Sequence, residues 1–124
     1  MKTLEQERAE FAWQKVQGQS DEYRNLVKSL PAMIMTSGLM QTLAFLQGKG
    51  KDHHKDLVNH IVEWLSKRKM VEKGSDFKKV MEKLYRSSSQ EYQRATEEVL
   101  AILRWLRQLV DAAQLLGKGG QQDA

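Results

Sequence analysis

The 124-residue chain contains no cysteine, only one proline and only three histidines. The lack of cysteine excludes disulfide bonds, thiolate zinc sites and thiol nucleophiles, and it suits a reducing compartment. The charged amino terminus does not have the pattern of a secretory signal. Residues 31–48 are uncharged, but Thr36, Ser37 and Gln41 make this stretch too polar to span a bilayer. We therefore expect a cytoplasmic protein without a membrane segment.

The sequence also has few features of β-strands. β-branched residues are sparse, and apolar and polar residues do not alternate over any sustained stretch. A chain of this length buries roughly two-thirds of its surface and forms one domain. We predict an all-α fold: a single compact bundle of five to seven helices over residues 1–116, with a buried central helix and a long C-terminal helix. We expect residues 117–124 to form a disordered tail.

Capping residues and hydrophobic spacing predict the individual helices. Thr3 is a suitable N-cap for the first helix. Gly74-Ser75-Asp76 combines a helix stop with a cap, and Ser87 to Ser89 form a second break that offers N-cap hydroxyls. The predicted helices span residues 3–17, 20–30, 32–47, 53–69, 77–84 and 89–116.

The segment 32–47 is predicted to be the central helix, because its apolar side chains surround the whole helical circumference. Pro31 either kinks the preceding helix or starts this one. Gly38 is unfavourable inside a helix, so it should mark a kink or a close backbone crossing. The polar residues of this segment have two interpretations. They satisfy buried groups inside the bundle, or they form an uncharged seam on which another subunit packs; these residues are Ser37, Gln41 and Thr42.

No set of residues has the spacing of a catalytic or metal site. His53, His54 and His60 do not share a ligand spacing, and we interpret them as exposed residues on a charged helix. The lysines and glycines of 48–51 do not follow the spacing of a phosphate-binding loop. Neighbouring carboxylates alternate with arginine on helices, which is typical of solvated ion pairs. We predict no catalytic residue, no metal and no cofactor.

The basic residues are concentrated in the middle of the chain. Residues 49–86 contain eleven basic and six acidic side chains, whereas the flanking segments are nearly balanced. Such a surplus favours a polyanionic partner, although a solvated lysine-rich surface would have the same composition. Phe11, Trp13, Phe45, Trp64 and Trp105 all lie in core-like stripes. Any nucleic-acid contact should therefore involve phosphates rather than stacked bases.

Three groups of motifs resemble the small subunit of the type III-B CRISPR RNA-guided effector complex, the Cmr complex. They occur in the order that this family shows, between about residues 4 and 107. They are Leu4-Glu5-Gln6 with Arg8-Ala9 and Ala12; Lys28-Ser29-Leu30-Pro31 with Gly38-Leu39 and 41–45; and 91–98 with Trp105-Leu106-Arg107. Residues 49–86 match this family only in being helical and basic.

The resemblance implies a non-catalytic subunit that stacks head to tail with copies of itself and contacts other Cmr subunits, the CRISPR RNA and its target RNA. Arg8, Lys28 and Arg94 lie within the matching stretches, so we predict them as the main phosphate contacts, with Lys15, Lys49 and Lys51 as secondary ones. We expect substitution of the three main contacts to leave folding unaffected. The dense set of lysines at 49–86 is the competing candidate.

Two other functions are compatible with parts of this pattern. A helical protein–protein adaptor without nucleic-acid binding would use its lysines only for solubility. A hydrolase would require an activity that cannot be placed on any residues of the chain. Salt-sensitive retention on heparin or on an RNA duplex distinguishes the RNA-binding subunit from the adaptor.

Overall fold

The computed structural model describes residues 1–122, with side chains described as far as Gly117, and this range contains six helices and no strand. The predicted all-α bundle is confirmed, and the helix count lies within the predicted five to seven. The helices are α1 (Leu4–Val16), α2 (Asp21–Ser37), α3 (Leu39–Lys49), α4 (Asp52–Lys67), α5 (Phe77–Arg86) and α6 (Ser89–Gln122).

Hydroxyl and carboxylate side chains cap the starts of α1, α2 and α5, as the sequence predicts. Thr3 and Gln6 form a reciprocal capping box at α1. Ser20 accepts a hydrogen bond from the Tyr23 N–H, and Asp76 accepts one from the Lys79 N–H. These local bonds fix where α1, α2 and α5 begin.

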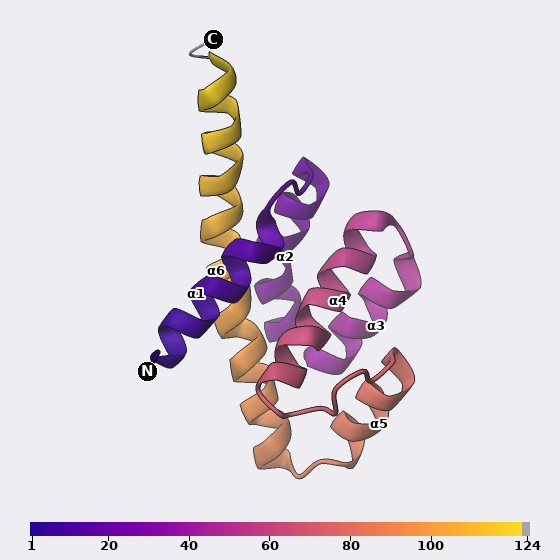
Figure 1. Ribbon diagram of the computed structural model, residues 1–124. Helices are drawn as coiled ribbons and strands as arrows, with labels where there is room; N and C mark the ends of the chain where they lie inside the picture. The colour runs from indigo at the N-terminus through magenta and orange to yellow at the C-terminus, as the bar shows by residue number, and fades with distance from the viewer. Residues whose placement is uncertain (123–124) are drawn as a thin grey trace.

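The long helix α6 runs along one side of the molecule, and α3 and α5 lie on the side away from it (Figure 1). α1 and α2 contact α6 directly, α4 contacts both α2 and α6, and α3 packs on α2 and α4. One hydrophobic core joins them. Its fully buried large side chains include Tyr23, Leu30, Leu39, Leu43, Leu57, Ile61, Leu65, Ile102, Leu103 and Leu106.

The predicted central helix 32–47 is wrong in two respects. α2 continues through Pro31 to Ser37, and a break at Gly38 separates it from α3. The segment is also not buried all round, because the Met35 side chain is 76% exposed. Apolar residues surround the circumference, but only one side of each short helix faces the core. Trp13, predicted in a core stripe, is likewise 39% exposed.

The break at Gly38 is specified by its backbone and by a contact from α6. Gly38 has φ 87°, a conformation that side-chain-bearing residues rarely adopt. A Cβ added to Gly38 would lie 3.6 Å from the Tyr92 hydroxyl. That hydroxyl accepts a hydrogen bond from the Met40 N–H at 3.1 Å, which satisfies a donor at the start of α3. The predicted special role of Gly38 is therefore confirmed as a helix break beside α6.

The end of α6 differs from the prediction. The helix continues to Gln122, whereas the sequence predicted its end at Leu116. The predicted disorder of residues 117–124 stays a prediction. Residues 123 and 124 lie outside the described residues. The last turns of α6 extend beyond the other helices (Figure 1), and the side chains of Leu115 and Leu116 are exposed there.

Candidate nucleic-acid interface

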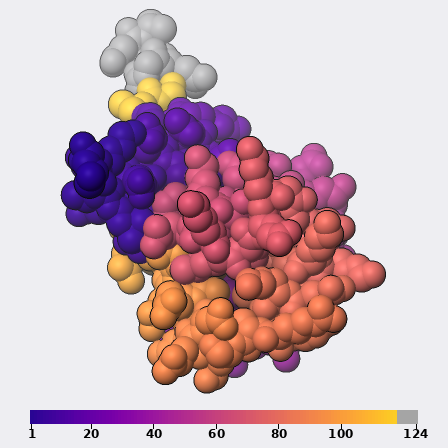
Figure 2. All heavy atoms as spheres, turned by 60° about the horizontal axis from the view of Figure 1, so that its bottom comes forward, coloured from indigo at the N-terminus to yellow at the C-terminus, as the bar shows by residue number. Residues whose placement is uncertain are grey.

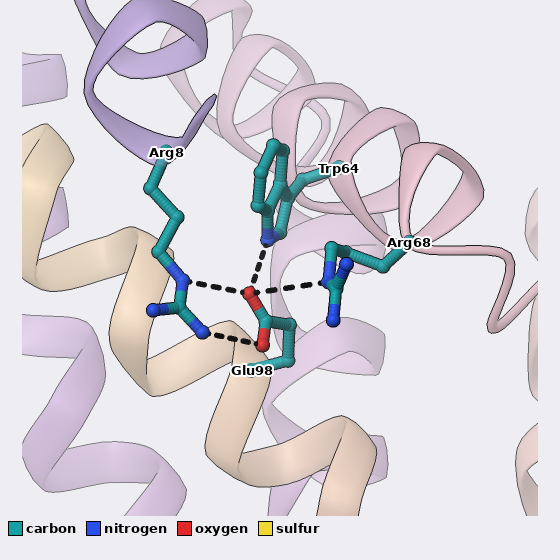
Figure 3. Close-up of polar contacts among 4 residues, drawn as sticks. All are labelled: Arg8, Trp64, Arg68 and Glu98. Atoms are coloured by element: carbon teal, nitrogen blue, oxygen red, sulfur yellow. Dashed lines mark hydrogen bonds and ion pairs between the residues drawn. The ribbon is translucent and has the colours of Figure 1, made fainter. Parts of the chain in front are cut away.

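The first predicted RNA contact, Arg8, binds the buried carboxylate of Glu98, which joins α1, α4 and α6 (Figure 3). The Glu98 side chain of α6 is almost completely buried. Arg8 of α1 donates from Nε to Glu98 Oε1 at 2.9 Å and from Nη2 to Oε2 at 2.8 Å. Trp64 Nε1 of α4 donates to Oε1 at 2.9 Å, and Arg68 Nε lies 3.8 Å from the same oxygen. We call Arg8, Trp64, Arg68 and Glu98 the Glu98 junction.

The side chains of the Glu98 junction stabilise one another in their charged forms. Burial alone would raise the pKa of Glu98, but the hydrogen bonds from Arg8 and Trp64 and the charges of Arg8 and Arg68 outweigh it, so the pKa is lowered. The hydrogen bond to Glu98 likewise raises the pKa of Arg8. The expectation that Arg8 is an exposed residue without a role in folding is wrong, because its side chain is only 21% exposed and holds α1 to α6.

Two more of the predicted contacts also form ion pairs between helices. Lys15 of α1 lies 2.5 Å from a Glu63 carboxylate oxygen of α4. Lys28 of α2 lies 3.4 Å from Asp111 Oδ1 of α6, and Arg24 shares that oxygen at 3.0 Å. Each of these cations therefore has a carboxylate partner within the fold.

The other three predicted contacts have a different environment. Among the residues with described side chains, Lys49, Lys51 and Arg94 form no ion pair. Lys49 ends α3 and lies over the Phe45 ring, and Lys51 directly precedes α4. Arg94 lies on the second turn of α6. The six residues thus divide into three paired and three unpaired cations, and they do not form one cluster.

Arg94 belongs to a cleft that the sequence did not reveal. The cleft has a volume of about 300 Å³ and lies between the end of α4, α5 and the start of α6. Four cationic side chains line it, and we call Arg68, Lys69, Lys83 and Arg94 the basic cleft. Figure 2 shows the side of the molecule on which the end of α4, α5 and the start of α6 meet. The signal for Arg68, Lys69 and Lys83 was the charge surplus in 49–86, but composition alone does not show which cations converge.

Comparison with known proteins identifies the family. The family model described as "CRISPR-associated protein (Cas_Cmr5)" matches residues 4–113. The chain belongs to the Cas_Cmr5 family. It is 32% identical over 117 residues to "CRISPR system Cmr subunit Cmr5" of Thermus thermophilus, with 90% of this chain and 96% of the relative covered. A relative of the same description from Thermotoga maritima is 32% identical over 114 residues, covering 86% and 81%.

A solved structure agrees with this assignment. The crystal structure of a CRISPR-associated Cmr5 family protein from Thermus thermophilus has a TM-score of 0.74 and 31% identity, and the comparison covers 91% of this chain and 98% of that one. The resemblance predicted from the sequence motifs is therefore confirmed. The matched residues 4–113 include the Glu98 junction, the basic cleft and all six predicted contacts of this Cas_Cmr5 chain.

The predicted subunit-interface residues are placed differently from one another. Ser37 and Gln41 are exposed at the junction of α2 and α3. Thr42 is fully buried, and its hydroxyl donates to the Gly38 carbonyl at 2.8 Å. Thr42 therefore fits the alternative interpretation, in which a polar residue satisfies the backbone inside the bundle, and it is inaccessible to a partner.

The histidines are not the exposed residues that the sequence suggested. His54 is buried beside Phe45, and His60 Nδ1 lies 2.7 Å from the Tyr23 hydroxyl. Burial lowers the pKa of His60 to about 4, so its ring is neutral at pH 7. Within the part of the chain that the structure describes, no group of three or more histidine or acidic residues could hold a metal, and no helix is long and apolar enough to cross a membrane.

Proposed function

We propose that this chain is the non-catalytic small subunit of a type III-B Cmr complex and that it contacts the backbone of the guide–target RNA duplex. Membership of the Cas_Cmr5 family and the description of two relatives as Cmr subunits support this assignment. Other Cmr subunits and neighbouring copies of the chain, stacked head to tail, are the proposed protein partners. Such stacking is heterologous and leaves a free surface at each end of a row.

The observation that carries the RNA-binding proposal is that three of the six predicted contacts have no carboxylate partner among the residues with described side chains. An unpaired cation is available to a phosphate, whereas a cation in an ion pair must first lose its partner. We therefore propose Arg94, Lys49 and Lys51 as direct contacts among the six predicted residues. Arg8, Lys15 and Lys28 contribute to the positive field around the molecule without donating to RNA themselves.

The aromatic residues support contact with phosphates rather than bases. Phe11 and Trp64 are buried, and Phe45 and Trp105 are partly buried against the core, whereas Trp13 and Tyr85 are exposed. Four of these six rings therefore lack the free face that base stacking requires. In RNA-guided systems the base pairs read the sequence while protein contacts the duplex backbone, which agrees with this arrangement.

The test is the salt dependence of RNA binding. The full chain and a variant carrying Lys49→Gln, Lys51→Gln and Arg94→Gln are titrated against RNA duplexes of two unrelated sequences. We expect equal affinity for both sequences, and we expect the variant to reduce the slope of log affinity against log salt concentration by about one for each phosphate that is no longer bound. Lys55→Gln with Lys73→Gln is a control in the same basic segment. If the chain binds neither duplex at low salt, the adaptor function is favoured.

The exposed residues Ser37 and Gln41 are the proposed protein interface, together with the neighbouring Met35. This surface is uncharged, and Met35 is largely exposed although it is apolar. A glutamate at Gln41 would place a charge into the packed seam, so we expect Gln41→Glu to prevent incorporation into a reconstituted Cmr complex. Incorporation at the wild-type level would exclude this surface.

A further inference from the structure

The basic cleft contains a lysine in a position where glycine is usual. α4 ends with hydrogen bonds from the Lys69 N–H to the Ser66 carbonyl and from the Met70 N–H to the Leu65 carbonyl, both 2.9 Å. This is the Schellman pattern, and its residue after the C-cap is left-handed and commonly glycine. Lys69 has φ 61° and is the one non-glycine residue with positive φ among the described residues. The backbone conformation at position 69 thus favours glycine, yet the position holds a lysine whose side chain lines the cleft.

Arg68 is incompletely satisfied by the Glu98 junction. Glu98 Oε1 already accepts from Arg8 and Trp64, and Oε2 accepts from Arg8. Arg68 Nε lies 3.8 Å from Oε1, which is beyond hydrogen-bond distance. This nitrogen is buried and has no hydrogen-bond partner among the described residues. Arg68 also lines the basic cleft, so its guanidinium group lies between the Glu98 carboxylate and the cleft.

The opposite side of the cleft adds two further cations and one carboxylate. Lys83 comes from α5 and Arg94 from α6, and the carboxylate is Glu91. Glu91 already accepts a hydrogen bond from the Ser88 N–H at 3.0 Å, where it caps the start of α6. The carboxylate therefore also caps α6, and the four cations that line the cleft outnumber this single negative charge.

We propose that the basic cleft binds one phosphate group, held between Arg68 and Lys69 on one side and Lys83 and Arg94 on the other. Its volume of about 300 Å³ reaches the lower end of the range for small-molecule sites, which leaves room for a phosphate with an attached sugar. Two arginine forks suit phosphate oxygens better than point charges do. The bound group is either a backbone phosphate of RNA or free phosphate. The first of these two ligands rests on the proposed function.

The first experiment compares cleft variants with matched controls on the same helices. Arg94→Gln is paired with Arg104→Gln on α6, and Lys83→Gln with Lys78→Gln on α5; both control residues are exposed and lie outside the cleft lining. We expect each cleft variant to weaken binding of an RNA duplex about tenfold, the size of one charge-assisted hydrogen bond. The controls should change affinity less than about threefold, as expected for a distant screened charge.

Titration with inorganic phosphate, followed by NMR of the arginine Nε–H groups, separates the two sources. Shifts at Arg68 and Arg94 that an RNA duplex reverses by competition support an RNA phosphate in the cleft. Shifts that the duplex does not affect support the site and assign it to free phosphate. The absence of shifts, together with wild-type RNA binding by the cleft variants, would overturn the proposal.

The same data distinguish this site from the proposed function. If the chain binds no RNA but phosphate shifts Arg68 and Arg94, the proposed function fails and the site stands. If RNA binding depends on Lys49 and Lys51 but not on the cleft, and phosphate shifts neither Arg68 nor Arg94, the function stands and the site fails.

Lys69→Gly tests whether this lysine serves binding or folding. Cations at the end of a helix also interact favourably with its dipole, and that role alone would explain Lys69 structurally. For a binding role we expect Lys69→Gly to weaken RNA binding while the midpoint of urea unfolding stays equal or rises, because glycine accepts positive φ without strain. Lys69→Gln should lose the same affinity and keep the strain. A lower midpoint with unchanged RNA binding would contradict the proposal.

Discussion

The Glu98 junction and the basic cleft are adjacent and share Arg68, yet their charges are arranged in opposite ways. In the junction, two hydrogen bonds from Arg8 and one from Trp64 converge on a single buried carboxylate. In the cleft, four cations surround a space in which the carboxylate is already used for helix capping. Complementary charges hold helices together, whereas charges without a complement are available to a ligand. Position in the fold, not the number of basic residues, separates the two tasks.

Removal of Glu98 should have the largest effect on folding. Glu98→Ala leaves Arg8 and the Trp64 N–H without their common acceptor and Arg68 without its ion-pair partner. Loss of one partner of a buried ion pair costs about 3 kcal/mol or more. Urea unfolding measures the change. The neighbouring Glu97 is exposed, so Glu97→Ala should change stability by less than about 0.5 kcal/mol. Equal effects of the two variants would show that the junction does not stabilise the fold.

Acid should weaken the Glu98 junction. Because the pKa of Glu98 is lowered from its ordinary value of 4.5, the folded state binds this proton more weakly than the unfolded state. The stability from ionised Glu98 is thus present above about pH 4.5 and is lost as the pH falls through the lowered pKa. We expect the difference in unfolding free energy between wild type and Glu98→Gln to shrink over that interval. A difference that stays constant down to pH 3 would contradict this titration.

Local features of this fold could be predicted from the sequence more completely than long-range ones. The caps at Thr3 and Asp76 depend on nearby residues and were predictable, and a glycine inside an apolar segment marked Gly38 although its contact with Tyr92 is long-range. The split of residues 32–47 into two helices, each with one buried side, depends on the surroundings of those helices, so periodicity alone did not show it.

The site was harder to predict because it combines distant segments. Arg8 and Glu98 are separated by 90 positions, and nothing in the sequence distinguishes a paired arginine such as Arg8 from an unpaired one such as Arg94. Likewise, Lys69 and Lys83 converge only because α5 folds back between the end of α4 and the start of α6. Composition indicated a basic segment, but the packing of these helices decides which cations face one another.

Among the cations that form ion pairs between helices, Lys28 should have a small effect on stability. Its partner Asp111 remains paired with Arg24 at 3.0 Å after substitution, and Lys28 lies 3.4 Å from the same oxygen. Lys28→Gln should therefore lower the unfolding free energy by less than about 0.5 kcal/mol. Arg24→Gln is the informative companion, because it removes the shorter ion pair and should cost more. If Lys28→Gln proved the more damaging of the two, the assignment of Arg24 as the main partner of Asp111 would be wrong.

The division between paired and unpaired cations is best tested by measuring stability and RNA affinity for Arg8→Gln and Arg94→Gln side by side. Arg8 is committed to Glu98, so we expect Arg8→Gln to lower the unfolding free energy by about 2 kcal/mol or more and to leave the RNA affinity of the folded chain within about threefold of wild type. Arg94 is exposed and unpaired among the described residues, so Arg94→Gln should leave stability unchanged and weaken RNA binding about tenfold. The reverse pattern, with affinity lost at Arg8 and stability lost at Arg94, would contradict the division of paired and unpaired charges between fold and RNA.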